Sequence, residues 1–293
     1  MTRPAGPEQT PPPGWYADPA DNTLSRYWDG RAWTAGVARE GRVWEQPIDP
    51  AAARRVWSEQ QDRRARWPAS TVFLGVAGAL AATGLAAAVQ VGAEAVAGEN
   101  DLVVFSASQV ALWLGLLASC ALVSHRYATG RLRQDYALDF RAADLGRGVG
   151  LSALGRLLSI VAIVPLVVLL DLETVENLQE FDDVSQGAVG LGLVFLFLLV
   201  GAPLVEELFF RGLLQRSLEP RLGAAGAIAL QAALFGLAHV STRLGVANVV
   251  IFAGTFAGGV VLGAAAWHYH RLGPGVVAHS LFNLLPAILI ALD

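Results

Sequence analysis

Seven long apolar runs separated by polar loops dominate the chain from residue 70 onward. They extend over roughly Ser70 to Val91, Leu102 to Val123, Val149 to Leu170, Gly187 to Val205, Ala224 to Val240, Val246 to Trp267 and Val276 to Leu292. Most are long enough to cross a hydrocarbon core, which takes about 20 helical residues. The pattern predicts an all-α polytopic membrane protein with about seven transmembrane helices, or eight if a further segment is re-entrant or interfacial. The fourth run is expected to continue as a helix to about Ser217.

The chain before these runs divides into three parts. Residues 1–12 are polar and proline-rich, so we expect disorder there. Residues 13–36 alternate aromatic and polar positions around Asp29-Gly30, which predicts a small β-hairpin-type domain with a Trp-rich core. Residues 37–66 are expected to be a linker that ends in an Arg-rich juxtamembrane helix. Residues 67–293 would then form the membrane domain.

Charge placement predicts the orientation of the membrane domain. Arginines cluster just before Trp67, and the following loops alternate between acidic and arginine-rich as far as the fourth run. Under the positive-inside rule this pattern places the N-terminus in the cytoplasm. The first 66 residues are polar, so we expect no cleavable secretory signal.

Composition supports the membrane assignment and excludes some partners. The chain is 54% hydrophobic and 16% charged, with a mean hydropathy of +0.46. Its net charge of -4 shows no basic excess, so we expect membrane lipid rather than nucleic acid as a partner. Cys120 is the only cysteine and lies among apolar residues, which favours an inert packed thiol.

Two adjacent carboxylates, Glu206 and Glu207, directly follow the apolar fourth run. An acidic residue at the centre of a membrane helix costs roughly 2.5 to 3.5 kcal/mol, so a pair of them indicates a function. Arg211 lies four residues after Glu207, the favourable order for a helical ion pair that neutralises Glu207. Glu206 is rotated by about 100 degrees from its neighbour and is the better candidate for a general base.

Three further polar residues stand in the apolar segments that follow. His279 and Asn283 are four apart and therefore share one helix face, where imidazole and amide groups are suitable donors to an oxyanion. His239 could orient a water molecule. With Glu206, this set has the parts for peptide hydrolysis.

The same residues leave metal dependence open. Glu206, His239 and His279 could bind a divalent ion such as zinc. There is no His-Glu-x-x-His motif, however, and asparagine is a poor zinc ligand. We favour a metal-free glutamate mechanism.

Three motifs resemble those of the CPBP intramembrane proteases, the CAAX prenyl protease and bacteriocin-processing family. They are Glu206-Glu207-Leu208-Phe209-Phe210-Arg211, Phe235-Gly236-Leu237-Ala238-His239 and His279-Ser280-Leu281-Phe282-Asn283. The resemblance covers about residues 149–292. It implies a helical bacterial plasma-membrane endopeptidase that acts on membrane-associated peptides or proteins. It also implies Glu206 as the water-activating base, His239 as its partner, His279 and Asn283 as transition-state stabilisers, and Glu207 and Arg211 in support.

The N-terminal pattern resembles a short tryptophan-rich domain of unknown function that precedes membrane segments in bacterial proteins. It consists of Gly14-Trp15-Tyr16, Asp18-Pro19, Arg26-Tyr27-Trp28-Asp29-Gly30 and Trp33-Thr34. That resemblance brings no chemistry with it. The partner of this domain remains unknown.

Two other functions fit the sequence. A non-catalytic scaffold of the same fold would keep the Glu207-Arg211 pair for stability, and a proton-coupled transporter would use Glu206 and His239 as a relay. The protease hypothesis also meets a geometric difficulty. In a simple up-and-down topology Glu206 approaches the inner face of the membrane, whereas His239 approaches the outer face. A tilt of the long fourth helix or a kink at Pro203 would have to bring them together.

Overall fold

The computed structural model describes residues 13–18, 21, 23–29, 33–47, 67–68, 70–98, 101–172, 184–241 and 245–292. The chain divides into two compact units, Met1–Arg66 and Trp67–Asp293, called here the sheet unit and the helical unit. The expected disordered segment 1–12, the Arg-rich helix before residue 67 and Gly30 of the predicted turn lie outside the described residues.

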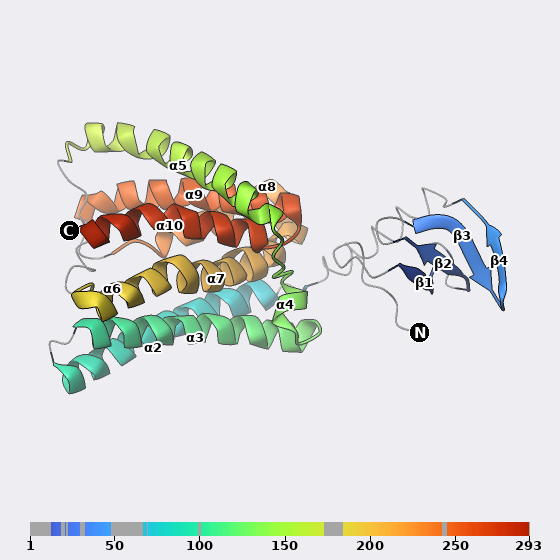
Figure 1. Ribbon diagram of the computed structural model, residues 1–293. Coiled ribbons are helices and arrows are strands. Elements are labelled where there is room, and N and C mark those ends of the chain that lie inside the picture. Colours follow the sequence, from blue (N-terminus) through green and yellow to red (C-terminus); the bar gives the residue numbers. More distant parts are fainter. Residues whose placement is uncertain are drawn as a thin grey trace. The chain divides into compact units, whose positions relative to one another are not determined.

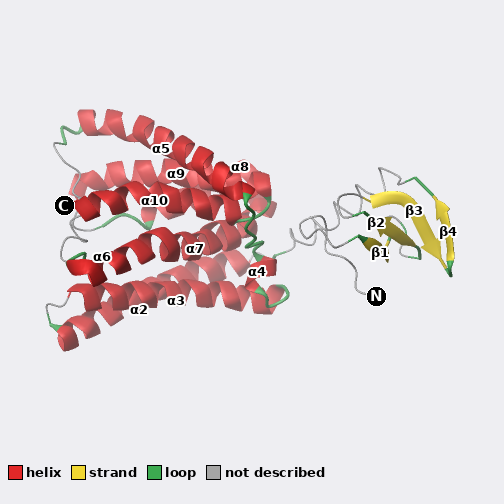
Figure 2. Ribbon diagram, in the orientation of Figure 1, coloured by secondary structure: helices red, strands yellow, loops and turns green. Residues whose placement is uncertain are grey.

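The sheet unit is an antiparallel sheet of four strands in the order β1-β2-β3-β4 (Figure 2). The strands are β1 (Gly14–Ala17), β2 (Ser25–Trp28), β3 (Trp33–Arg39) and β4 (Arg42–Glu45). One face buries Trp28 and Val37. It also buries Arg26, which pairs with Asp18 at 2.9 Å. The predicted hairpin is therefore only part of the sheet.

The expected boundary at residue 36 falls inside β3. The sequence suggested a linker from residue 37, but Val37 pairs with Trp44 across β3 and β4. Val37 is completely buried, so a boundary at this point would cut the small core. The aromatic residues mark β1, β2 and the start of β3 well, whereas β4 carries only Trp44 as an aromatic signal.

The helical unit is a bundle of long helices (Figure 1). Its elements are α2 (Ser70–Ala97), α3 (Asp101–Tyr127), α4 (Leu132–Asp135), α5 (Ala143–Leu169), α6 (Gly187–Leu196), η2 (Phe197–Gly201), α7 (Ala202–Glu206), η3 (Glu207–Gln215), α8 (Arg216–Leu237), η4 (Gly245–Ala247), α9 (Asn248–Tyr269) and α10 (Gly273–Leu292). The elements η2 and η3 are π-helical, and η4 is a 3₁₀ turn. In Figure 1, α10 runs between α5 and the α6–α7 segment.

Six helices of the described part are long and apolar enough to cross a membrane. One of them, Gly187–Leu237, is continuous over 51 residues and combines two of the seven predicted runs. The backbone breaks inside it at Gly223, whose φ of 66° lies in the left-handed region that glycine tolerates. The count of seven or eight spans is thus not confirmed, because it depends on this break.

Side chains on both sides of Gly223 show that the chain turns back there. The Arg211 guanidinium lies 4.3 Å from the ring centroid of Phe235. These residues are twelve positions before and twelve after Gly223. Residues 207–215 therefore run antiparallel to the second half of α8. This helical hairpin brings Glu207 and His239, which are equally far from Gly223 along the chain, to the same level.

The outer surface of the bundle is apolar, as expected for a protein in lipid. Phe73 on α2 and Val168 and Leu169 on α5 are each more than 70% exposed. Inside, glycines let helices approach closely: a side chain at Gly254 would meet Ile163, and one at Gly259 would meet Ala232. These features are those of a multi-pass membrane protein.

Candidate active site

The two adjacent glutamates lie where the helix changes from α to π geometry. Glu206 ends α7 and Glu207 begins η3. A second π-helical turn, η2, precedes Pro203. π-helical turns are rare in proteins and occur often at functional sites, because they redirect side chains within a helix.

Glu207 is the centre of a buried network. Its Oε1 accepts a hydrogen bond of 2.9 Å from Arg211 Nη1, and both side chains are 0% exposed. The pair predicted from the i, i+4 spacing is therefore present. The same Oε1 lies 3.1 Å from Nδ1 of His279 on α10. The Glu207 carboxylate thus connects η3 to α10 and fixes the His279 ring.

Glu206 is the less constrained of the two carboxylates. Its side chain is 17% exposed, and Oε2 lies 3.7 Å from His279 Nε2. That distance is too long for a hydrogen bond. Oε2 is buried without a hydrogen-bond partner, so Glu206 keeps a free acceptor beside the imidazole.

His239 follows the end of α8 and joins this group through Phe235. Its ring lies 4.6 Å from the Phe235 ring, which in turn lies 5.7 Å from the His279 ring. His239 Nδ1 is 2.7 Å from the carbonyl oxygen of Phe235. A carbonyl can only accept, so Nδ1 carries a proton, and Nε2 of the neutral ring is an acceptor.

Asn283 is held by a carbonyl that the helix leaves free. The N–H of Ala202 bonds to the carbonyl of Phe197 in π geometry, and Pro203 has no N–H to offer. The Leu198 carbonyl, which would otherwise use one of these donors, accepts a 2.9 Å hydrogen bond from Asn283 Nδ2. Asn283 therefore joins α10 to η2, and it has one amide hydrogen beyond the one donated to Leu198.

The structure brings Glu206, Glu207, Arg211 and His279 together. The exposed His239 ring is connected to this group only through Phe235, and the described hydrogen bond of Asn283 goes to Leu198. The helical hairpin at Gly223 resolves the difficulty over depth, since it brings His239 back to the level of Glu207. Gly275 on α10 permits the close approach, because a side chain there would come within 2.9 Å of Glu207 Oε2.

Comparison with known families agrees with the motifs. Residues 188–285 match the family described as type II CAAX prenyl endopeptidase Rce1-like. The match covers about a third of the chain and includes all three motifs. Residues 13–54 match a domain described as a protein of unknown function, DUF2510. Searches of curated proteins and of solved structures find no match.

Both predicted resemblances are therefore confirmed. The matched region, residues 188–285, runs from α6 into α10 and contains all three motifs. The family supports an endopeptidase activity within a multi-pass membrane protein. The match to the N-terminal domain reaches residue 54, beyond the predicted boundary at residue 36, and brings no chemistry.

The helical unit has no cluster of ligands arranged as a metal site among its described residues. Among the described residues, no group of three or more His, Cys, Asp or Glu side chains is arranged to hold a metal ion. The set named from the sequence, Glu206, His239 and His279, therefore does not fit the ligand geometry of zinc as it stands. One oxygen of the neighbouring Glu207 is already bonded to both Arg211 and His279.

Two polar residues of the helical unit make contacts that the sequence did not predict. Arg156 lies in the middle of α5. It donates to the carbonyl of Phe282, which has lost its helical donor because Pro286 has no N–H. The signal was an arginine in mid-run together with a proline in the last run. Gln231, a single amide in an apolar run, is completely buried.

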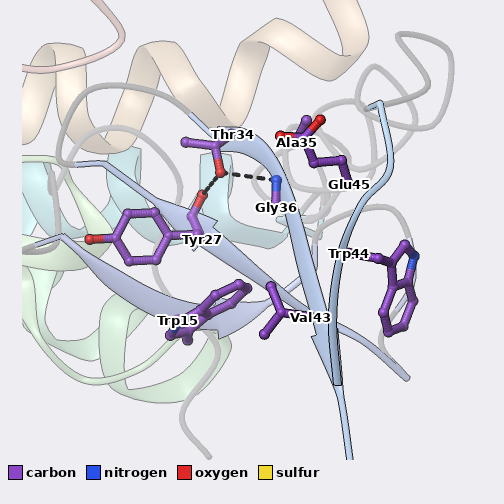
Figure 3. A pocket seen from close by; sticks show the side chains of 8 residues that line it. All are labelled: Trp15, Tyr27, Thr34, Ala35, Gly36, Val43, Trp44 and Glu45. Carbon is purple, nitrogen blue, oxygen red and sulfur yellow. Dashed lines mark hydrogen bonds between the residues drawn. The ribbon is translucent and has the colours of Figure 1, made fainter. Parts of the chain in front are cut away.

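The sheet unit has a pocket of a different kind (Figure 3). Trp15, Tyr27, Val43 and Trp44 contribute to its lining, and Glu45 is the only ionisable carboxylate there. The Thr34 hydroxyl donates to the Tyr27 carbonyl and accepts from Gly36 N. With aromatic surface, one carboxylate and no histidine in its lining, this pocket does not repeat the paired glutamates and imidazole of the helical unit.

Proposed function

We propose that this protein is an intramembrane endopeptidase that hydrolyses peptide bonds of membrane-associated substrates with water activated by Glu206. The observation that carries the proposal is the unpartnered Oε2 of Glu206, which is buried beside His279 while Glu207 is neutralised by Arg211. One carboxylate is thus free to take a proton, and the other is occupied in holding the imidazole.

In the proposed reaction, Glu206 accepts a proton from water, and the resulting hydroxide adds to the carbonyl carbon of the peptide bond. His239 Nε2, an acceptor in the neutral ring, helps to orient that water. The C–N bond then breaks, and the proton on Glu206 passes to the departing amine. The general base is expected to contribute about 10²- to 10⁴-fold to the rate.

His279 and Asn283 would stabilise the negative oxygen of the tetrahedral intermediate. Asn283 has one amide hydrogen beyond the one donated to Leu198. His279 can donate from Nε2 when both ring nitrogens carry protons, with Nδ1 donating to Glu207. Donors of this type typically contribute about 10²- to 10³-fold each.

The proposed setting is a bacterial plasma membrane with the N-terminus in the cytoplasm, as the arginine-rich loops favour. The family description names CAAX prenyl endopeptidases, so a prenylated peptide ending in a C-a-a-X sequence is the first substrate class to test. The same peptide without the prenyl group would show whether the lipid matters.

The test is cleavage of these two peptides by full-length protein reconstituted in lipid vesicles. Glu206→Gln keeps the shape of the side chain but removes the base, and we expect at least about 10²-fold slower cleavage. A parallel sample with a chelator separates a metal-free reaction, which would persist, from a metal-dependent one, which would stop. Equal rates for wild type and Glu206→Gln would contradict the role of Glu206, and no cleavage by either would favour the scaffold.

A proton-coupled transporter makes a different prediction for the same vesicles. Its activity would depend on a proton gradient across the membrane, whereas hydrolysis would not. Cleavage that continues after the gradient is collapsed with an ionophore supports the protease.

A further inference from the structure

Two buried glutamines lie behind the proposed site, where η3 and the second half of α8 pack on α9. Gln231 is 0% exposed and Gln215 is 1% exposed. Both lie eight residues from Gly223, on opposite arms of the helical hairpin. Buried amides inside an apolar bundle are costly unless they are hydrogen-bonded, so their contacts indicate what they do.

Gln231 shares an acceptor with the arginine of the site. Its Nε2 donates to the Gly259 carbonyl on α9 at 3.0 Å. Arg211 Nη2 reaches the same oxygen at 3.4 Å, while Arg211 Nη1 holds Glu207 at 2.9 Å. Gly259 makes this sharing feasible, because it has no side chain to separate α9 from Ala232.

Sharing the Gly259 carbonyl with Gln231 affects the orientation of the Arg211 guanidinium. Of the two bonds to the Gly259 carbonyl, the one from Gln231 is shorter. Arg211 therefore makes only a long contact with Gly259, and its shorter hydrogen bond is the one to Glu207. Arg211 Nε has no partner, so Nη1 and Nη2 make the only hydrogen bonds that orient the group among the described residues. Without Gln231, the Gly259 carbonyl is open to a shorter bond from Arg211 Nη2, which would shift the guanidinium over the Phe235 ring toward Gly259 and away from Glu207.

We infer that Gln231 is a positioning residue for the hydrolysis, which acts on His279 through Gly259, Arg211 and Glu207. This inference rests on the proposed function. It differs from a general packing role because it predicts an effect on turnover that depends on Arg211.

Gln215 is a matched control in the same interface. It makes a contact of the same kind, from Nε2 to the Gly263 carbonyl at 3.0 Å, one turn farther along α9. It bonds in addition to Glu219 and shares no acceptor with Arg211. Gln231→Leu and Gln215→Leu therefore each remove a buried bond to a carbonyl of α9, and Gln215→Leu removes the bond to Glu219 as well. Only Gln231→Leu removes a donor that shares its acceptor with Arg211.

The experiment measures kcat, KM and thermal unfolding of full-length protein in lipid vesicles with the peptide that the wild type cleaves best. We expect Gln231→Leu to lower kcat about tenfold with KM nearly unchanged, and Gln215→Leu to leave kcat within about twofold. Gln231→Met, which also lacks the donor but is unbranched, is assayed in parallel in case the leucine variant does not fold. Gln215→Leu, which loses two hydrogen bonds, should lower the unfolding temperature at least as much as Gln231→Leu.

A double-mutant cycle with Arg211→Lys completes the test. If Gln231 acts through Arg211, the second change should add less than about twofold to the loss in kcat caused by Arg211→Lys alone. Multiplicative losses, or equal losses for the Gln231 and Gln215 variants, would overturn the inference and leave the proposed function intact. Failure of the wild type to cleave any peptide would overturn both.

Discussion

The helical unit contains two buried arginine–carboxylate pairs with opposite properties. Arg271 binds Asp144 through two hydrogen bonds of 2.6 Å, and the same carboxylate also accepts from Arg141 N and Arg147 Nη1. In the other pair, Glu207 Oε2 and Arg211 Nε are buried without partners. A buried ion pair needs its remaining polar atoms satisfied to be stabilising.

The difference distinguishes a structural clamp, the Asp144–Arg271 pair, from the Glu207–Arg211 pair of the proposed active site. The Asp144 pair joins the start of α5 to the segment before α10, and every polar atom of its carboxylate is in use. The Glu207 pair leaves atoms free in the region that also contains Glu206, His239 and His279. Unsatisfied buried groups in a native protein indicate strain, bound water or function, and here they coincide with the sequence motifs.

The largest loss of turnover is expected for Glu207→Gln. The amide keeps an oxygen that can accept from Arg211 and His279, but it removes the charge that holds both. We expect about 10²-fold slower peptide cleavage, because the His279 ring is less well oriented. We also expect a loss of about 3–5 kcal/mol in the free energy of unfolding, because Arg211 is left buried without its paired charge. Steady-state kinetics and denaturant unfolding of the same preparation measure both quantities. A variant that unfolds normally and cleaves at the wild-type rate would show that the Glu207 pair is only structural.

Much of this site could be predicted from the sequence. Helical spacing was enough to pair Glu207 with Arg211 and to place His279 and Asn283 on one face, since residues four apart are neighbours on any helix. The apolar runs predicted the helical bundle for the same reason. The order of the motifs predicted the family similarity that is found over residues 188–285.

Other features could not be predicted because they depend on the backbone or on long-range packing. The π-helical turn before Pro203 frees the Leu198 carbonyl that Asn283 occupies, and no side-chain pattern signals such a turn. The hairpin at Gly223, which has a positive φ, lies in a stretch whose sequence predicts a polar loop between two apolar runs. In the sheet unit, β4 was read as linker because a strand of four residues gives little periodicity.

A smaller loss of turnover is expected for Gly275→Ala, which disturbs the Glu207 pair without removing a charged group. A Cβ at this position would come within 2.9 Å of Glu207 Oε2, so the carboxylate or α10 must shift. We expect about tenfold slower cleavage, because small displacements of catalytic groups are costly. Gly258→Ala is the matched control, since its Cβ would meet Phe282 and Ser159 only at ordinary distances of 3.8 and 3.9 Å. Similar rates for the two variants would mean that the position of Glu207 has little influence on turnover.

The smallest effect on turnover is expected at the other pair, in Asp144→Ala. This change leaves the Arg271 guanidinium buried without its carboxylate, which costs about 3–5 kcal/mol in the free energy of unfolding. Cleavage per folded molecule should nevertheless stay within about twofold, because Asp144 contacts none of the proposed catalytic side chains by any described hydrogen bond. Arg147→Ala removes a more exposed partner from the same carboxylate and should cost about 1 kcal/mol or less. Denaturant unfolding in detergent, with activity normalised to folded protein, measures both variants. A large loss of specific activity in Asp144→Ala would show that the clamp transmits its position along α10 to His279, so that the two pairs work as one unit.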